Sequence, residues 1–194
     1  MRKIAISLIL GLTQYVSAGE LTILGIKFDE PFSGNVCATL SVSGRSTNEV
    51  ALSQVTQPCV GPRNQYDWQG AAAKVWIPPL LIPNALLNPI TVIFNGDRPK
   101  AMLIDVGGVS MNAAAFDLLK EKLGQPTKVE NATKQNAYGA KFEVIEAEWQ
   151  TPNFEASLST SAINKGVIFI AGPAATAKNI EIRAKQNTQR KPSL

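Results

Sequence analysis

The 194-residue chain contains no histidine. This absence excludes Ser-His-Asp and Cys-His catalytic arrangements, metal sites with histidine ligands, and pH switches that depend on an imidazole. Charged residues are also few, at 18%, against 45% hydrophobic residues and a mean hydropathy near zero. These values exclude a collagen, a coiled coil and an acidic disordered tail. They fit one compact domain, or two small ones.

Several short catalytic and ligand-binding motifs are missing as well. The sequence has no Cys-x-x-Cys pair, no Ser-x-x-Lys motif and no Asp-x-Asp-x-Asp-Gly calcium loop. Gly107-Gly108 precedes a predicted helix, but it belongs to neither a GxGxxG fingerprint nor a P-loop and indicates only a turn. We therefore expect no catalytic residue, no cofactor and no metal site, and the sequence favours a protein that is not an enzyme.

The first 18 residues have the pattern of a secretory signal peptide. Met1-Arg2-Lys3 is a basic start, Ile4 to Val16 is an apolar run, and Val16-Ser17-Ala18 supplies small residues for cleavage after Ala18. The alternative, a membrane anchor, is disfavoured because 13 residues including Thr13 and Gln14 are too short to span a bilayer. We expect no stable membrane anchor after cleavage, and a periplasmic or secreted location.

The excess of positive charge is concentrated at the two ends of the chain. Without Arg2 and Lys3 the protein keeps 17 basic and 15 acidic residues, and the segment 178–194 alone carries a net charge of +4. The body is therefore slightly acidic, which argues against nucleic-acid binding because such proteins need a basic folded surface. We expect the basic tail, 178–194, to be solvated and without regular structure.

Cys37 and Cys59 are the only cysteines. An even number of cysteines in an exported chain predicts a disulfide, and with two there is only one possible pairing. The bridge would hold the N-terminal part, residues 19–89, which is rich in loops. Within it we expect an opening strand over 21–26, and between the cysteines one strand and a loop.

Residues 75–96 form an unusual segment of 22 residues without any charge. Pro78, Pro79, Pro83 and Pro89 exclude a helix or a central strand, so we expect an extended apolar connection. It either lies across the body and closes the core, or it is an exposed loop that docks on a partner or a membrane surface. On the second interpretation the candidate partner contacts are Trp76, Leu80, Leu81 and Ile82.

The second half of the chain, residues 90–177, has clear periodicity. A hairpin is predicted from Ile90–Phe94 and Lys100–Val106, joined by Asn95-Gly96-Asp97. A helix follows, capped by Ser110 or Asn112, with Phe116, Leu119 and Leu123 on its apolar face and Gly124 at its end. We then expect three strands, at 140–149, 154–159 and 167–171. The sequence predicts an α+β fold in which one main helix packs on a curved antiparallel sheet.

The segment Phe116–Thr127, in which a helix ends in Leu-Gly-x-Pro, precedes a strand meander. In this respect residues 110–172 resemble small exported bacterial modules of the BamE and β-lactamase-inhibitor-protein type. The resemblance implies a module that binds other proteins and performs no chemistry. It assigns no functional residue in this chain.

The side chains that could act in binding or catalysis are a group of acids and the tryptophans. Glu143, Glu146 and Glu148 lie on one predicted strand, where Glu146 and Glu148 share a face and could supply a carboxylate for glycoside hydrolysis. The alternative is a solvated strand face neutralised by lysines. Trp68, Trp76 and Trp149 are candidate interface anchors or, alternatively, core residues.

The interpretation favoured by the sequence is an exported, non-enzymatic protein-binding module, such as an envelope accessory factor or an inhibitor of a secreted enzyme. The partner is expected to be another protein, contacted through the uncharged segment or the exposed face of the C-terminal sheet. Two alternatives remain: a carboxylate-dependent hydrolase of envelope polysaccharide, and a structural component of a secretion or conjugation assembly. The oligomeric state is not indicated by the sequence.

Overall fold

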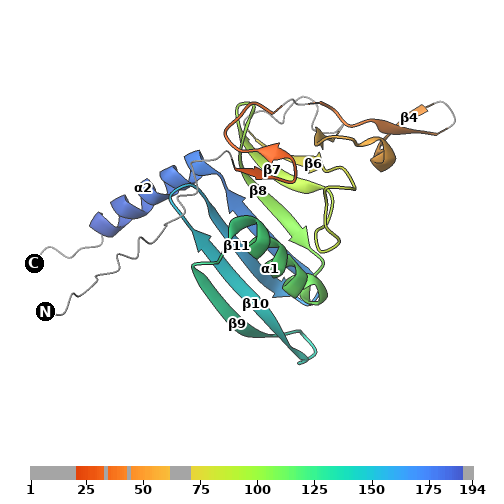
Figure 1. Ribbon diagram of the computed structural model, residues 1–194. Helices are drawn as coiled ribbons and strands as arrows, with labels where there is room; N and C mark the ends of the chain where they lie inside the picture. Colours follow the sequence, from red (N-terminus) through yellow and green to blue (C-terminus); the bar gives the residue numbers. More distant parts are fainter. Residues whose placement is uncertain (1–20, 33–34, 43–44, 62–70, 190–194) are drawn as a thin grey trace, which may run out of the picture.

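The computed structural model describes residues 21–32, 35–42, 45–61 and 71–189. In these ranges the main feature is one antiparallel sheet of eight strands (Figure 1). Their spatial order is β5 (Cys59–Val60), β6 (Ala72–Trp76), β7 (Ile90–Asn95), β8 (Arg98–Val106), β12 (Lys165–Ala171), β11 (Glu155–Ala162), β10 (Lys141–Gln150) and β9 (Lys128–Gln135). The sheet runs across the boundary expected at residues 89–90, because β5 and β6 come from the N-terminal part.

The N-terminal part also forms two small antiparallel hairpins. The first joins β1 (Thr22–Ile23) to β2 (Ile26–Lys27) through Leu24 and Gly25, whose φ angles are 52° and 77°. This tight turn replaces the single strand expected over 21–26. The second hairpin pairs β3 (Thr39–Val42) with β4 (Arg45–Val50), followed by the short 3-10 helix η1 (Leu52–Gln54), where we expected one strand and a loop.

Helix α1 (Val109–Leu123) packs across one face of the sheet (Figure 1). Of the predicted apolar face, Leu119 is buried and Phe116 and Leu123 are half-buried, while Ala115, which was not predicted, is buried as well; the helix ends at Gly124, whose φ is 81°. The predicted cap was wrong. The helix begins after Gly108, at φ 74°, where a Cβ atom would lie 2.3 Å from the carbonyl oxygen of Ile163 and exclude other residues.

The side chain of Asn112 holds α1 to the sheet. Its Oδ1 accepts a hydrogen bond from the Ile145 amide at 2.7 Å, and its Nδ2 donates to the Ile145 carbonyl at 3.0 Å and to Thr160 Oγ1 at 3.1 Å. The backbone pairing of β10 with β11 extends only as far as Ala147 opposite Leu158. Asn112 therefore satisfies the backbone of β10 beyond the point where its ladder with β11 ends.

The segment after α1 contains one strand more than expected. β9 pairs with β10 over its full length and forms an edge of the sheet, whereas we predicted only three strands after the helix. Most side chains of β9 are exposed and polar. A strand without a buried face lacks the alternation that identified β10, β11 and β12.

A second helix, α2 (Pro173–Gln189), follows β12 directly. The tail from residue 178 was expected to lack regular structure; it is helical as far as Gln189, and its described side chains are mostly exposed. Asp29 anchors the start of α2, since its Oδ2 accepts a hydrogen bond from the Ala174 amide at 2.9 Å and its Oδ1 pairs with Lys100. Beyond this anchor, α2 extends away from the sheet (Figure 1).

The core lies between α1, the N-terminal hairpin and the inner face of the sheet. Its largest fully buried side chains come mostly from the sheet: Trp149, Ile26, Ile77, Ile90, Met102, Ile104, Leu158, Ile168 and Ile170. The α+β class and the disulfide are confirmed. A single main helix is not, because α2 has 17 residues and α1 has 15.

Candidate functional site

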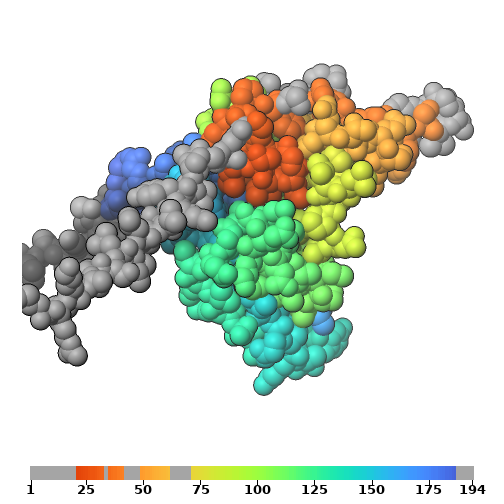
Figure 2. All heavy atoms as spheres, in the orientation of Figure 1, coloured from red at the N-terminus to blue at the C-terminus, as the bar shows by residue number. Residues whose placement is uncertain are grey.

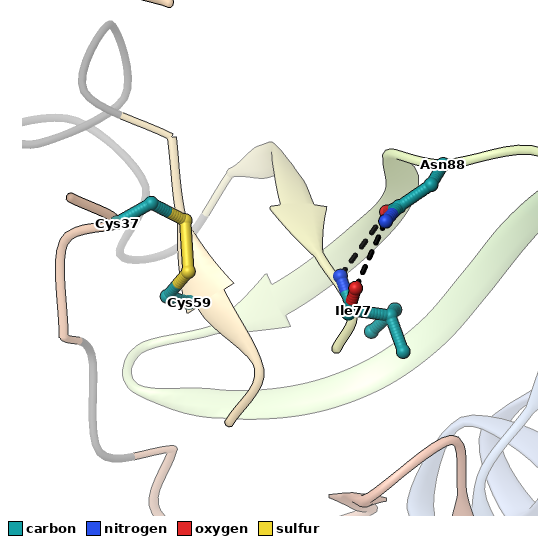
Figure 3. Close-up of a disulfide and its surroundings, with 4 residues drawn as sticks. All are labelled: Cys37, Cys59, Ile77 and Asn88. Carbon is teal, nitrogen blue, oxygen red and sulfur yellow. Dashed lines mark hydrogen bonds between the residues drawn. A yellow bond between two sulfur atoms is a disulfide. The ribbon is translucent and has the colours of Figure 1, made fainter. Parts of the chain in front are cut away.

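The loop 77–89, between β6 and β7, is held in a fixed shape by its own residues. The Ile77 amide donates to Asn88 Oδ1 at 3.1 Å, and Asn88 Nδ2 donates back to the Ile77 carbonyl at 2.9 Å (Figure 3). This pair of hydrogen bonds closes the base of the loop. Inside it, the Leu81 amide bonds to the Pro78 carbonyl and the Leu86 amide to the Pro83 carbonyl, both at 2.9 Å, so each proline begins a turn.

The loop 77–89 is buried in one part and exposed in another, so each of the two interpretations describes one part of it. Ile77, Ala85 and Leu86 are buried and close one side of the core. The tip is exposed: Leu80 is 99% accessible and Leu81 is 47% accessible. Because the turn at Pro78 fixes Leu80 in solvent, this leucine gains nothing from folding, and its burial in a complex would gain about 1.5–3 kcal/mol.

An apolar groove of about 470 Å³ lies beside this tip. Three segments border it, namely the β1–β2 hairpin, the loop 77–89 and the C-terminal half of α1, and they meet on one face of the molecule (Figure 2). The residues that line it are Thr22, Ile23, Leu24, Gly25, Leu80, Leu81, Pro83, Leu86, Ile104, Leu118, Leu119, Glu121, Lys122, Ile168 and Ile170. Its volume falls within the range of about 300–1,000 Å³ that is typical of ligand-binding pockets.

The groove has an apolar floor and a charged rim. Side chains of β8 and β12 form part of the floor, and leucines of the hairpin, loop and helix form the walls. At the rim, Lys122 Nζ lies 3.0 Å from Glu121 Oε1, and both side chains are exposed. An apolar centre within a polar border is the usual composition of a protein–protein interface.

The structure separates the four residues predicted to contact a partner. Leu80 and Leu81 line the groove, and Ile82 is half-buried against the main core. Trp76 packs elsewhere, against Cys37, Val55 and Cys59. Cys37 and Cys59 form the disulfide, in which their Cα atoms are 5.1 Å apart (Figure 3). The ring of Trp76 lies so close to Gly61 that a Cβ atom there would be 2.2 Å from it. Trp76 therefore belongs to the packing of the disulfide region.

The remaining tryptophans do not extend the groove. Trp149 is buried in the core, where its ring lies 6.2 Å from that of Phe116. Trp68 lies outside the described residues. Sequence reasoning missed Ile23, Leu24 and Leu118, which come from segments distant in the chain and were assigned to a strand and a helix without a role in binding.

Glu146 and Glu148 of β10 lie on the face of the sheet opposite α1, whereas Glu143 falls on the other face by strand alternation and accepts a hydrogen bond from Thr133 Oγ1 at 2.6 Å. Glu146 and Glu148 share a shallow hollow of about 230 Å³ with Lys128 and Glu130. Each of two acids has a lysine partner, since Lys134 lies 2.7 Å from Glu146 and Lys128 lies 2.8 Å from Glu130. The hydrogen bond to Glu130 raises the pKa of the Lys128 ammonium. This arrangement favours an ion-paired strand surface over a pair of catalytic carboxylates.

No family model, curated protein or solved structure matches the chain. The resemblance of residues 110–172 to BamE-type modules therefore stays a prediction. Neither described helix is both long and apolar enough to cross a bilayer. In the same part of the chain, no three acidic or cysteine side chains are grouped so that they could hold a metal ion.

Proposed function

We propose that this protein is an exported protein-binding module, and that the apolar groove takes an apolar segment of a partner protein. The observation that carries the proposal is the fully exposed Leu80, held at the edge of a groove of about 470 Å³ with leucine and isoleucine walls. Contiguous apolar surface of this kind marks interaction sites, because it is costly to leave in water.

The shape of the groove favours a protein partner over a small apolar molecule. Leu80 stands at the rim of the groove with 99% of its surface exposed, so an occupant confined to the groove would cover only part of this leucine. A partner surface that covers both would bury Leu80 and Leu81 and also reach the Glu121–Lys122 pair at the rim. Aliphatic side chains of the partner would enter the groove, and its polar side chains would meet the charged border.

Export is supported by two independent features. The N-terminal residues have the composition of a signal peptide, with cleavage expected after Ala18. The bond between Cys37 and Cys59 is buried and structural, and disulfides of this type persist in oxidising compartments such as the bacterial periplasm. An envelope location, periplasmic or secreted, is therefore the setting in which we expect the partner.

We expect Leu81→Asp to abolish capture of the partner from envelope extract when the oxidised protein is used as bait. A carboxylate at the wall of the groove would have to be desolvated on binding, which costs several kcal/mol. The matched control is Leu52→Asp, because Leu52 is 46% exposed, close to the 47% of Leu81, and lies on η1 outside the groove. Quantitative mass spectrometry of the captured proteins measures the result.

The pattern across the two variants decides the outcome. A protein retained by the wild type and by Leu52→Asp, but lost with Leu81→Asp, supports the groove as the binding site. A protein retained equally by all three baits contradicts it and places the contact elsewhere. Circular dichroism of both variants confirms that neither substitution unfolds the protein.

A further inference from the structure

The two edges of the eight-stranded sheet differ in how they are protected. At one edge, β5 has only two residues, and Val60 is already bonded on its outer side: its amide donates to the Asn35 carbonyl and its carbonyl accepts from the Cys37 amide, both at 2.9 Å. At the other edge, β9 has eight residues in unbroken register with β10, contains no proline, and has no further strand beside it among the described residues (Figure 1). A long, regular edge of this kind is a template for another strand.

The backbone groups that face this open edge belong to the odd-numbered residues of β9. The amide and carbonyl of Ile145 on β10 both bond to Asn112, on the side away from β9. Asn131 lies directly opposite Ile145, so its own amide and carbonyl point away from β10, toward the edge. The even-numbered Asn136 donates inward, to the Ala140 carbonyl at 3.0 Å, as the same alternation requires. The outward-facing set is Val129, Asn131, Thr133 and Gln135.

A second copy of β9 fits this edge in antiparallel orientation, about a two-fold axis perpendicular to the sheet. Outward groups meet outward groups only when odd residues lie opposite odd residues, so the axis must pass through a residue. An axis at Asn131 would set Lys128 against Lys134 twice, and an axis at Glu130 or at Lys134 would set that residue against itself. An axis at Ala132 sets Glu130 against Lys134 twice, whereas an axis one residue further on pairs neither charge.

The charges of β9 also form ion pairs within the chain, and the second copy adds to these. Lys128 lies 2.8 Å from Glu130, and Lys134 lies 2.7 Å from Glu146. The strand register nevertheless places Glu130 directly opposite Glu146, so two acids are cross-strand neighbours. Lys134 of the second copy would lie on the other side of Glu130 and offset this like-charge contact. Lys128 would meet the uncharged Asn136, and the odd residues carry no charge.

We propose that two copies of this chain associate edge to edge through β9, in antiparallel register about Ala132, and so extend one sheet across both copies. A two-fold contact must be self-complementary, and β9 meets this condition in both its backbone groups and its charges. No residue of β9 lines the groove, so the groove stays open in the dimer. Helix α2 is attached two strands away, where Arg183 lies 3.0 Å from Glu155 of β11.

A cysteine at the axis tests the register. The two Ala132 residues would form a non-hydrogen-bonded pair with Cα atoms about 4.5 Å apart, within the range that a disulfide spans. Under mild oxidation, protein with Ala132→Cys should form a covalent dimer at least about tenfold faster than protein with Lys128→Cys, because the two Lys128 positions lie at opposite ends of the contact. Non-reducing electrophoresis measures both rates, and equal rates would contradict this register.

Sedimentation velocity tests the association itself. The oxidised wild-type protein should show a concentration-dependent doubling of mass. Asn131→Pro removes an amide that faces the edge and no hydrogen bond to β10, so it should weaken the dimer by about tenfold or more. Glu130→Lys should weaken it as well, since it sets like charges together twice, and the double variant Glu130→Lys, Lys134→Glu should restore it. Leu81→Asp, in the groove, should leave the dimer unchanged.

Two results would overturn the proposal. The first is a wild-type protein that stays monomeric across the accessible concentration range. The second is a dimer that neither Asn131→Pro nor Glu130→Lys weakens, because such a dimer does not use the edge of β9. Asn131 and Glu130 are exposed, and a far-UV spectrum identical to that of the wild type verifies that each variant is folded.

Discussion

Trp149→Ala is expected to reduce the free energy of unfolding by about 3–5 kcal/mol, the usual cost of removing a buried tryptophan side chain. Trp149 is 1% exposed and is the largest fully buried side chain of the core. Its ring packs against Phe116 of α1, and its Nε1 donates to the Gly124 carbonyl at 2.9 Å, just after the helix ends. The side chain therefore fixes α1, and with it one wall of the groove, to β10.

Two further variants separate the contributions of Trp149. Trp149→Phe keeps an aromatic ring but removes the indole donor, so we expect a smaller loss of about 1–2 kcal/mol. Tyr138→Ala is the control, because Tyr138 is 97% exposed and its substitution should change stability by less than about 0.5 kcal/mol. Urea unfolding followed by circular dichroism measures all three. A loss below about 1 kcal/mol for Trp149→Ala would contradict the central place of this residue in the core.

Asn112→Ala is expected to cost about 2–4 kcal/mol, although it removes only a small side chain. The buried amide of Asn112 makes three hydrogen bonds, and two of them satisfy the N–H and C=O of Ile145 where β10 is no longer paired with β11. Alanine cannot form these hydrogen bonds, so the substitution removes the side-chain partner of the Ile145 N–H and C=O. The loss is therefore a desolvation penalty rather than a cavity effect.

Hydrogen exchange distinguishes this mechanism from a general weakening of the helix. In Asn112→Ala the Ile145 amide should exchange faster than the neighbouring amides of β10, whereas Asp117→Ala, at an exposed position of the same helix, should leave it protected. Thr160→Val should cost less than Asn112→Ala, because Asn112 Nδ2 also donates to Ile145. Unchanged protection of Ile145 in Asn112→Ala would show that the hydrogen bonds do not hold β10.

Local patterns were sufficient to predict the parts of the fold that have a buried face. The hairpin around Gly96, the apolar side of α1 with Leu119, and the termination of α1 at Gly124 all follow from alternation, periodicity and turn chemistry. The disulfide follows from the cysteine count. Apart from the disulfide, which joins residues 22 positions apart, each signal lies within a few residues of the feature that it specifies.

The features that were missed depend on information of another kind. β9 has no buried face, so its alternation is weak. No helix was predicted after the strand at 167–171, yet proline is common in the first turn of a helix, and Pro173 is the first residue of α2. Asn112 was interpreted as a possible helix cap. Its actual role was missed because its partner, Ile145, lies 33 residues away and no local pattern connects the two residues.

The candidate site shows the same limit. The uncharged loop was identified from its composition, and Leu80 and Leu81 do line the groove. The other walls could not be predicted, because Leu24 and Leu118 reach the groove through the long-range packing of a hairpin and a helix. Trp76 was grouped with the leucines by its nearness in sequence, whereas the end of β6 directs it to the disulfide region.

The most direct test of the binding function is site-specific photo-crosslinking in living cells. A benzophenone side chain is introduced singly at Leu24, Leu81 and Leu118, which line three different walls of the groove, and at Leu52 and Tyr138, which lie outside it. We expect all three groove positions to form an adduct with the same partner protein and the two outside positions to form none. A partner adduct that forms from Leu52 or Tyr138 and from none of the groove positions would contradict the proposed function.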